Sequence, residues 1–429
     1  KLCLRCSAWA WNFQLLGFRK KKAMCKLSIL STVILSTAMA YAQQNQIDFI
    51  GPMSPEFAQF GDFDVGVRTI EVIMPDAVDV LNTRRGEGTA FYERRLTLEV
   101  WYPASLAGAP SGGTYEVVTR NPEITAILHG RAVRDAEPLK ESGPYPLIII
   151  SHGYPGNRYL LSHTGENLAS KGYLVASIDH KESTYEDQQS IASTLYNRPI
   201  DQRFVLNSLA MLSEELDSPF YSMVDSGNTG IIGYSMGGFG LVNNLGAGFS
   251  EQSVNGFISP PNSLLKFHAT SDPGFRERLD PRIKAGFVIA PWGMNAGFWE
   301  ESDLAGITVP SFFLAGDRDN VAGYENGTKK IFAGAINSER YLLTFLNAGH
   351  NAGAPIPVPI ELDNAENLEP AMHYRDENWD NVEMNNIMDH YATIWFDHYL
   401  KGVNRGGALN TVPPVYQERL VIEHLPVSE

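Results

Sequence analysis

Apolar runs and helical periodicities alternate along most of the chain. Continuous apolar runs, typical of strands buried on both faces of a parallel sheet, cover residues 146–151, 173–178, 229–232, 285–290, 311–315 and 341–345. Helical spacing or helix-end signals mark residues 160–171, 205–216, 328–336 and 382–399. Together with strand patterns at 67–73 and 96–102, this alternation predicts an α/β fold, with a mostly parallel central sheet flanked by helices.

Three segments lack a clear period. Residues 43–64 are mixed in character, and we expect them to wrap the surface. Residues 104–142 and 351–378 are rich in turn residues, and we interpret them as insertions that fold over a functional site. Because no repeat or low-complexity linker is present, residues 43–429 are expected to form a single domain.

The first 42 residues differ from the rest. Lysines at 20–22 precede an apolar run over 27–38, and Ala40-Tyr41-Ala42 follows. A basic start, a short apolar run and an A-x-A sequence predict a secretory signal peptide that is cleaved after Ala42. Met24 is then the expected start of translation, and the rest of the chain is expected to be secreted or periplasmic. A buried N-terminal helix is the alternative.

Composition and charge narrow the choice of partners. The chain is 44% hydrophobic and 19% charged, as soluble globular proteins are. Its formal net charge is −15, and residues 1–42 hold seven basic residues and no acidic one, so the remainder is more acidic still. Such a charge argues against nucleic acids and anionic membranes as partners. All three cysteines lie before Ala42, so no disulfide is expected beyond it.

The sequence Gly233-Tyr234-Ser235-Met236-Gly237 is a candidate nucleophile elbow. In the pattern G-x-S-x-G the serine lies on a sharp turn between a strand and a helix, and the small flanking residues let the turn close. The pattern is short enough to occur by chance. Its context is informative, however, because an apolar strand precedes it and a glycine-rich helix start follows. Ser235 is therefore predicted to be a nucleophile.

A serine nucleophile needs a histidine base, which a carboxylate orients. In chain order the carboxylate and then the histidine are expected after the elbow. His350 follows the last apolar strand and is the predicted base, whereas His390 and His398 fall in the terminal helix. Asp319 follows the strand at 311–315 and is the predicted carboxylate, with Asp317 as the alternative.

The same chemistry needs two backbone N–H groups that face the developing oxyanion. One is expected from Met236, the residue after the nucleophile. The other is expected from Tyr154, in the glycine-rich loop over residues 152–157 that follows the strand ending at Ser151. An ordinary glycine turn is the alternative interpretation of this loop.

Several of these stretches resemble a known superfamily. The sequences at 145–153 and 233–238, with those at 98–104 and 177–180, resemble the branch of the α/β-hydrolases that contains platelet-activating-factor acetylhydrolases and dienelactone-hydrolase-like enzymes. The resemblance covers most of residues 60–405 and implies the α/β-hydrolase fold. Dienelactone hydrolases use a cysteine nucleophile, whereas this chain has Ser235.

A second departure affects the predicted carboxylate. In the acetylhydrolases the aspartate of the triad follows the strand after the elbow, where this chain reads Ala290-Pro291-Trp292. The later Asp319 must then serve, which makes the site similar to that of cutinase-like polyester hydrolases. That resemblance implies an aromatic wall, so Trp292 and Tyr234 are candidate substrate-contact residues; the alternative is that both are ordinary buried aromatics.

We therefore expect a serine carboxylic-ester hydrolase that needs no metal or organic cofactor. A phospholipase A2-like or acetylhydrolase-type lipid acyl hydrolase and a cutinase-like polyester hydrolase are alternatives. A peptidase and a non-catalytic binding module on the same fold are further rivals. Substrate and oligomeric state stay open, as does cation binding by an acidic loop with Glu361, Asp363, Glu366 and Glu369, for which a solvated loop is favoured.

Overall fold

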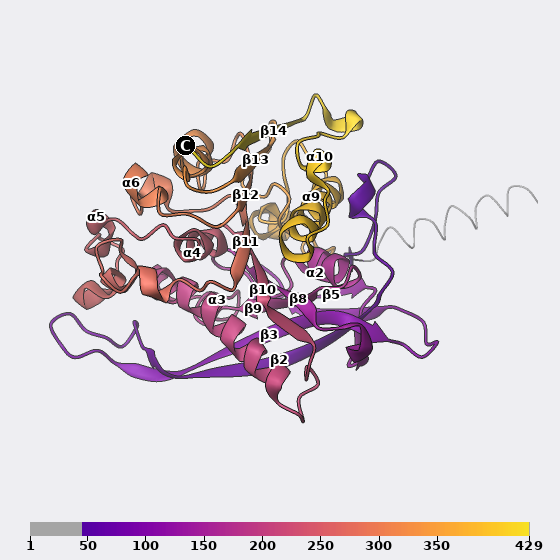
Figure 1. Ribbon diagram of the computed structural model, residues 1–429, viewed down its shortest axis with the longest axis horizontal. Helices are drawn as coiled ribbons and strands as arrows, with labels where there is room; N and C mark the ends of the chain where they lie inside the picture. The colour runs from indigo at the N-terminus through magenta and orange to yellow at the C-terminus, as the bar shows by residue number, and fades with distance from the viewer. Residues whose placement is uncertain (1–44, 429) are drawn as a thin grey trace, which may run out of the picture. The chain divides into compact units, whose positions relative to one another are not determined.

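The predicted apolar runs form the centre of one large mixed sheet (Figure 1). The computed structural model describes residues 45–428. The predicted signal peptide lies outside them and stays a prediction. Parallel strands at the centre of the sheet are β8 (Tyr145–Ser151), β9 (Leu174–Asp179), β10 (Val224–Tyr234), β11 (Ile283–Ile289), β12 (Ser311–Gly316) and β13 (Arg340–Phe345).

Further strands extend this sheet on both sides, and all of them except β6, which is parallel to β2, pair antiparallel with their neighbours. The strand order is β14-β13-β12-β11-β10-β8-β9-β3-β2-β6, and β7 pairs with β3. The additional strands are β2 (Asp64–Val78), β3 (Phe91–Ser105), β6 (Val133–Arg134), β7 (Glu137–Pro138) and β14 (Leu420–Leu425). A separate small sheet has the order β1-β5-β4, formed by β1 (Asn45–Gln46), β4 (Gly113–Val118) and β5 (Thr125–Gly130).

Helices cover both faces of the large sheet, as Figure 1 shows. On one face lie α2 (Ser162–Ala169) and α9 (Asn381–Lys401), and on the other lie α3 (Ile191–Glu214) and α4 (Met236–Asn244). The shorter helices are α5 (Glu251–Val254), α6 (Glu301–Leu304), α7 (Lys329–Gly334), α8 (Leu368–Met372) and α10 (Gly406–Leu409). The predicted α/β architecture is therefore present. No helix in residues 45–428 is long and apolar enough to cross a membrane.

The alternation of side chains along β8 explains its uninterrupted apolar sequence. Ile148 and Ile150 belong to the hydrophobic cluster that includes Trp395 of α9. Leu147 and Ile149 belong to the cluster on the opposite face. All four side chains are fully buried. Successive side chains of a strand point to opposite faces, so a strand with helices on both sides must be apolar at every position.

Some elements were not predicted. Strands β2 and β3 run for 15 residues each, well beyond the expected 67–73 and 96–102. The antiparallel edge strand β14 and the strands of the small sheet were also missed. Leu216, expected on the helix of residues 205–216, lies beyond the end of α3 at Glu214 and is 77% exposed.

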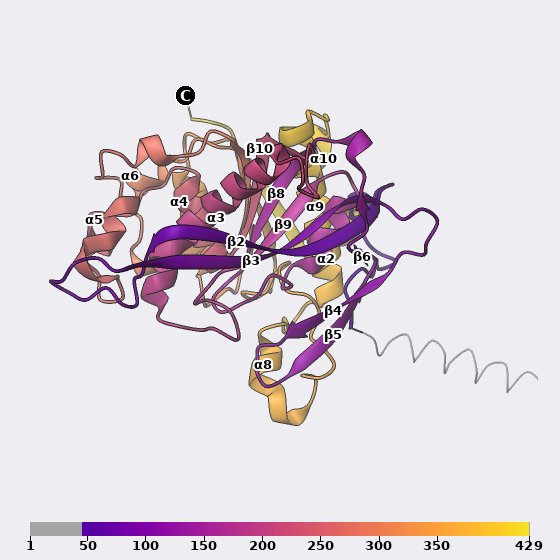
Figure 2. The same cartoon turned by 90° about the horizontal axis from the view of Figure 1, so that it is seen from below.

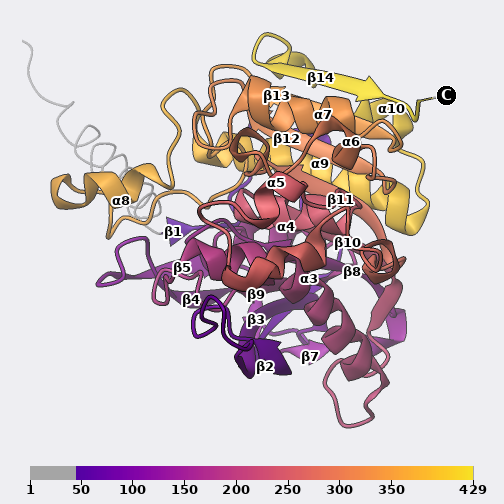
Figure 3. The ribbon, with the colours of Figure 1, turned by 90° about the vertical axis from the view of Figure 1, so that its left-hand side faces the viewer.

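The two predicted insertions lie next to each other. Figures 2 and 3 show β4 and β5, from the first insertion, beside α8, from the second. The Asn121 side chain donates a hydrogen bond to the Asn367 Oδ1 at 2.9 Å, and the Asn45 side chain donates one to Glu361 at 2.8 Å. The small sheet thus ties the second insertion to the N-terminal part of the described chain.

His163 on α2 predicts a pH-dependent stability. The side chain is 2% exposed, and neither ring nitrogen has a hydrogen-bond partner among residues 45–428. Burial lowers the pKa of His163 to about 3. Below pH ~6.5 the unfolded chain binds a proton that the folded chain does not, so this site costs about 1.4 kcal/mol of unfolding free energy per pH unit down to the folded pKa.

We expect His163→Phe to remove that cost. The unfolding free energy of the variant minus that of the natural chain should be about 2 kcal/mol larger at pH 5 than at pH 8, when both are measured by urea denaturation. Comparing the two pH values cancels any packing effect of the ring itself. An equal gain from His373→Phe, at an exposed position on the same protein, would contradict the assignment to burial.

Candidate active site

The site lies where the order of the parallel strands reverses. Strand β8 has β9, the next strand in sequence, on one side and β10, which follows β9 in sequence, on the other. Ser151 at the end of β8 pairs in register with Gly233 near the end of β10. The two following loops therefore leave the sheet side by side. In open α/β sheets this reversal at the carboxyl ends of the strands is where ligands bind.

Sterics and backbone strain define the turn at Ser235. Ser235 has φ 52° and ψ −111°, a conformation that a non-glycine residue rarely adopts. A Cβ atom on Gly237 would lie 1.9 Å from the Ser151 carbonyl oxygen, and one on Gly233 would lie 2.5 Å from the Gly237 carbonyl oxygen. The Ser235 N–H donates to the Ile289 carbonyl at 2.9 Å. Both glycines of the pattern are thus required by close contacts.

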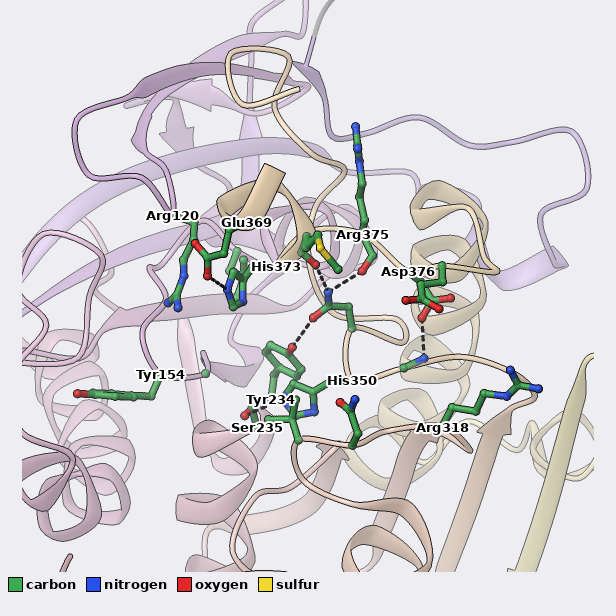
Figure 4. Close-up of a pocket in the computed structure, with 18 of the residues that line it drawn as sticks. Arg120, Tyr154, Tyr234, Ser235, Arg318, His350, Glu369, His373, Arg375 and Asp376 are labelled. Carbon is green, nitrogen blue, oxygen red and sulfur yellow. Dashed lines mark hydrogen bonds and ion pairs between the residues drawn. The ribbon is translucent and has the colours of Figure 1, made fainter. Parts of the chain in front are cut away.

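The structure brings Ser235, His350 and Asp319 together in one hydrogen-bonded chain (Figure 4). The Ser235 Oγ lies 2.9 Å from the His350 Nε2, and the His350 Nδ1 lies 2.9 Å from an Asp319 carboxylate oxygen. Asp319 follows β12, and His350 follows β13, its neighbour in the sheet. Three separate loops at one edge of the sheet therefore supply the three groups.

The surroundings of Asp319 favour its ionised form. Burial alone would raise the pKa of this carboxyl, but the hydrogen bond from His350 and its charge when protonated hold the pKa below its usual value. The N–H groups of Val321 and Ala322 also donate to it, at 2.8 and 3.0 Å. The alternative carboxylate, Asp317, instead accepts a hydrogen bond from the Asn347 N–H. It therefore holds the turn after β13 and does not contact the imidazole.

Two backbone N–H groups close to Ser235 have no hydrogen-bond partner among residues 45–428. Neither the Tyr154 N–H nor the Met236 N–H donates a hydrogen bond to another residue in the described part of the chain. Met236 begins α4, directly after Ser235. The loop that carries Tyr154 is also close to the nucleophile, because a Cβ on Gly153 would lie 3.3 Å from the Ser235 Cβ. Unpaired N–H groups beside a nucleophile can stabilise a developing oxyanion.

Sequence reasoning missed the groups that orient the Tyr154 N–H. The Gly153 carbonyl accepts a hydrogen bond from the His152 Nδ1 at 2.7 Å and from the buried Arg198 guanidinium at 3.4 Å. Arg198 also donates to the His152 carbonyl. In a trans peptide the C=O and N–H point in opposite directions. Holding the Gly153 carbonyl on the buried side therefore turns the Tyr154 N–H to the other side.

The tautomer of His152 agrees with this arrangement. The His180 backbone N–H donates to the His152 Nε2 at 3.3 Å, so the ring proton is on Nδ1 and is donated to the Gly153 carbonyl. Burial lowers the pKa of His152 well below its usual value, which keeps the ring neutral. The histidine within the loop, His152, could have been recognised from the sequence as a group that orients the loop. No sequence signal marked Arg198, because it lies on α3, far from the loop in sequence.

A second serine–histidine–aspartate chain lies beneath the first. The Ser151 Oγ is 2.8 Å from the His180 Nε2, and the His180 Nδ1 is 2.9 Å from Asp201. Arg94 pairs with Asp201 at 2.7 Å. Ser151 and Asp201 have no exposed surface, whereas Ser235 is 7% exposed and lines a pocket. The lower chain cannot meet a substrate, so we interpret it as support for the sheet edge.

A pocket of about 500 Å³ opens over Ser235. Both predicted insertions contribute to its walls, through Arg120 in the first and through α8 and the residues after it in the second. Tyr234 lines the pocket, as expected; its hydroxyl donates to the Asn351 Oδ1 at 2.9 Å and its ring lies 5.2 Å from the His350 ring.

Trp292 is placed differently. Its backbone N–H donates to the Ser235 carbonyl at 3.2 Å, but its ring packs on Phe298, with centroids 5.5 Å apart. Trp292 is not among the residues that line the pocket. Its expected role as a substrate contact stays a prediction, and its visible role is to pack beside the elbow.

His390 and two members of the acidic loop have ordinary partners, whereas the buried His398 Nδ1 has none among residues 45–428. His390 is buried, and its Nδ1 accepts a hydrogen bond from the Phe57 N–H at 3.0 Å. In the acidic loop, Asp363 pairs with Arg375 and Glu369 pairs with His373. Among residues 45–428 no group of three or more histidine, cysteine, aspartate or glutamate side chains is arranged to hold a metal ion.

Comparisons with known proteins agree with the predicted resemblance. A protein-family model described as PET hydrolase-like matches residues 111–258, which include Tyr154 and Ser235. The chain is 27% identical over 228 residues to a platelet-activating factor acetylhydrolase of Cavia porcellus, covering 49% of this chain and 48% of that protein. It is 24% identical over 215 residues to the cutinase est1 of Thermobifida alba, covering 50% and 56%.

The chain thus spans about half the length of the curated relatives it matches. Among solved structures, a ferulic acid esterase from Streptomyces cinnamoneus superposes with a TM-score of 0.58 at 19% identity, covering 89% of this chain and 99% of that one. This match shows a shared fold. The resemblance to acetylhydrolases and cutinases that the motifs predicted is therefore confirmed, and the chain resembles serine esterases of the α/β-hydrolase superfamily.

Proposed function

We propose that this protein is a serine carboxylic-ester hydrolase with the α/β-hydrolase fold. The observation that carries the proposal is the unbroken hydrogen-bonded chain from Ser235 through His350 to Asp319 at the floor of a pocket. Two unpaired N–H groups, those of Tyr154 and Met236, lie beside the nucleophile. A nucleophile, a base, an orienting carboxylate and an oxyanion site are the parts that acyl transfer requires.

In the first half-reaction, the Ser235 Oγ attacks the ester carbonyl carbon while its proton moves to the His350 Nε2. Asp319 holds the imidazole in the tautomer with its proton on Nδ1 and stabilises the imidazolium that forms. The N–H groups of Tyr154 and Met236 bind the negative oxygen of the tetrahedral intermediate. The carbon–oxygen bond to the alcohol then breaks, and His350 gives its proton to the departing alkoxide.

In the second half-reaction, water replaces the alcohol. His350 takes a proton from the water as its oxygen attacks the acyl carbon, and the same two N–H groups bind the new oxyanion. Breaking the bond between the acyl carbon and the Ser235 Oγ releases the carboxylic acid. His350 returns the proton to Ser235, which restores the free enzyme.

The relatives suggest two narrower substrate classes. An acetylhydrolase-type enzyme would cleave short acyl groups from lipids, and a cutinase-like enzyme would cleave polyesters. The pocket is walled by both insertions, which favours small or single-chain esters over a broad polymer surface. We therefore propose soluble small-molecule esters as the main substrates. Rates on a series of p-nitrophenyl esters, phospholipids and polyester films would rank the three classes.

Active-site labelling tests the proposal directly. We expect a fluorophosphonate probe to modify the natural chain once, on the peptide that contains Ser235, and to leave Ser235→Ala unmodified when intact mass is measured. The natural chain should also hydrolyse p-nitrophenyl butyrate. Ser226→Ala, on a serine elsewhere on β10, is the matched control and should be labelled fully. Labelling on another serine, or full esterase activity of Ser235→Ala, would refute the proposed function.

A further inference from the structure

Arg120 lies at the tip of the hairpin between β4 and β5, where the first insertion reaches the pocket. Three contacts hold this tip in place. The Arg120 backbone N–H donates to the Tyr374 hydroxyl at 3.1 Å, and the Val118 carbonyl accepts a hydrogen bond from the Asn157 side chain at 2.8 Å. The third contact is the Asn121–Asn367 hydrogen bond between the insertions. The backbone that carries Arg120 is therefore fixed to both the second insertion and the oxyanion loop.

The guanidinium of Arg120 enters the pocket without a protein partner. Figure 4 shows its side chain pointing from the hairpin toward the side of the pocket on which Tyr154 and Ser235 lie. Arg120 is half-buried and makes no side-chain hydrogen bond or ion pair with any residue in the range 45–428. Its positive charge is near enough to Tyr234 and Tyr185 to oppose the rise in their pKa values that burial causes.

Most other charged groups around the pocket have a partner, and the exception among the described residues, Glu377, is exposed. Arg375 pairs with Asp363, and Glu369 pairs with His373 at 3.0 Å. Arg318 is bound by the Asn347 side chain, and the Asp376 carboxylate accepts hydrogen bonds from backbone N–H groups, including that of Gly349 at 2.6 Å. Arg120 is thus the half-buried charged group of this lining whose side chain has no partner in the described residues, and a charge partly removed from water gains from a partner of opposite charge.

We propose that Arg120 is an anion-recognition residue and that the preferred substrates are esters that also carry a carboxylate. This inference rests on the proposed ester hydrolysis at Ser235. The guanidinium presents a planar set of donors that binds a carboxylate through two parallel hydrogen bonds. The same pocket is also lined by Tyr234, Tyr185 and Leu160, which suit an apolar or aromatic spacer. Monoesters of dicarboxylic acids have this form.

Paired substrates give the kinetic test. The anionic ester is the mono-p-nitrophenyl ester of glutaric acid, and the neutral one is p-nitrophenyl butyrate, which has the same carbon chain with a hydrogen in place of the terminal carboxylate. We expect Arg120→Gln to lower the ratio of kcat/KM for the anionic over the neutral ester by about 10- to 100-fold. Arg120→Lys, which keeps the charge but not the planar pair of donors, should lower it less.

The control is Arg318→Gln, which removes another positive charge that lines the same pocket. It should keep the ratio within about threefold, because a pocket-wide field effect is smaller than a direct ion pair. An equal fall in the ratio for both variants, or no fall for Arg120→Gln, would overturn the proposal.

A binding experiment separates this inference from the proposed chemistry. In the Ser235→Ala background, isothermal titration calorimetry would measure glutarate and inorganic phosphate with and without Arg120→Gln. We expect glutarate to bind at least tenfold more weakly once Arg120 is replaced. Tighter binding of phosphate than of glutarate would refute the carboxylate assignment. Equal glutarate binding by both chains would refute the role of Arg120, whether or not the enzyme cleaves esters.

Discussion

Replacing Ser235 or His350 with alanine should lower kcat for p-nitrophenyl butyrate by about a million-fold, and replacing both should lower it no further. The reason is the single hydrogen-bonded chain that joins them, with Ser235 Oγ and His350 Nε2 only 2.9 Å apart. Each residue acts only through the other, so removing one already removes what the pair supplies. Additive losses would mean that the two residues act independently, contrary to the proposed mechanism.

The carboxylate should matter less than the other two members. Asp319→Asn keeps the shape of the loop but favours the wrong imidazole tautomer, and a fall in kcat of about 10⁴-fold is expected. Asp317→Asn is the matched control two residues away, because this carboxylate accepts a hydrogen bond from the Asn347 N–H and does not reach His350. Stopped-flow assays of the natural chain and overnight assays of the slow variants together cover this range of kcat. A larger loss from Asp317→Asn than from Asp319→Asn would reverse the assignment of the acid.

The sequence was sufficient to predict the parts of the protein that local rules govern. Strand β8 had to be apolar throughout because helices cover both of its faces, and that is what made it recognisable. The elbow was predictable for a similar reason. Gly233 and Gly237 face backbone atoms so closely that no larger residue fits, so the spacing in the sequence reflects contacts in the fold.

What sequence reasoning missed depends on pairing between distant segments. Strand β14 contains exposed and half-buried side chains, and only its pairing with β13 makes it a strand. Strands β4 and β5, whose hairpin carries Arg120, were missed for the same reason, because their pairing is hidden in a turn-rich insertion. The sequence placed Trp292 after the strand that follows the elbow, as the structure does. The direction of its ring depends on packing against Phe298, and no local pattern revealed that contact.

Arg198 is the clearest case of a functional contact hidden from the sequence, and it carries the second large prediction. Its guanidinium donates to the carbonyls of His152 and Gly153 and so fixes the peptide whose N–H belongs to Tyr154. An oxyanion donor acts in the transition state and not on the bound ester. We therefore expect Arg198→Met to lower kcat by about 100-fold while KM changes by less than about threefold.

Three measurements separate a loss of catalysis from a loss of stability. They are the rates well below the Tm, the same rates for a matched control variant, and the preference for an ester over its thionoester. Arg198→Met takes the donor from the His152 carbonyl and leaves the Gly153 carbonyl with the His152 ring alone. The change should cost about 1–3 kcal/mol of stability, so rates are to be compared well below each variant's Tm. Arg203→Met is the matched control, since this arginine lies on the same helix and binds Asn244, away from the loop.

The specific readout is the preference for an ester over its thionoester, in which sulfur replaces the carbonyl oxygen. Sulfur accepts hydrogen bonds weakly, so an oriented pair of N–H groups favours the oxygen substrate. Arg198→Met should reduce that preference, because the Tyr154 N–H is no longer held toward the reacting carbonyl. Arg203→Met should leave it intact. If Arg198→Met lowers the Tm but keeps both kcat and the ester preference, the hydrogen bonds to the Gly153 peptide stabilise the fold and do not orient the oxyanion site.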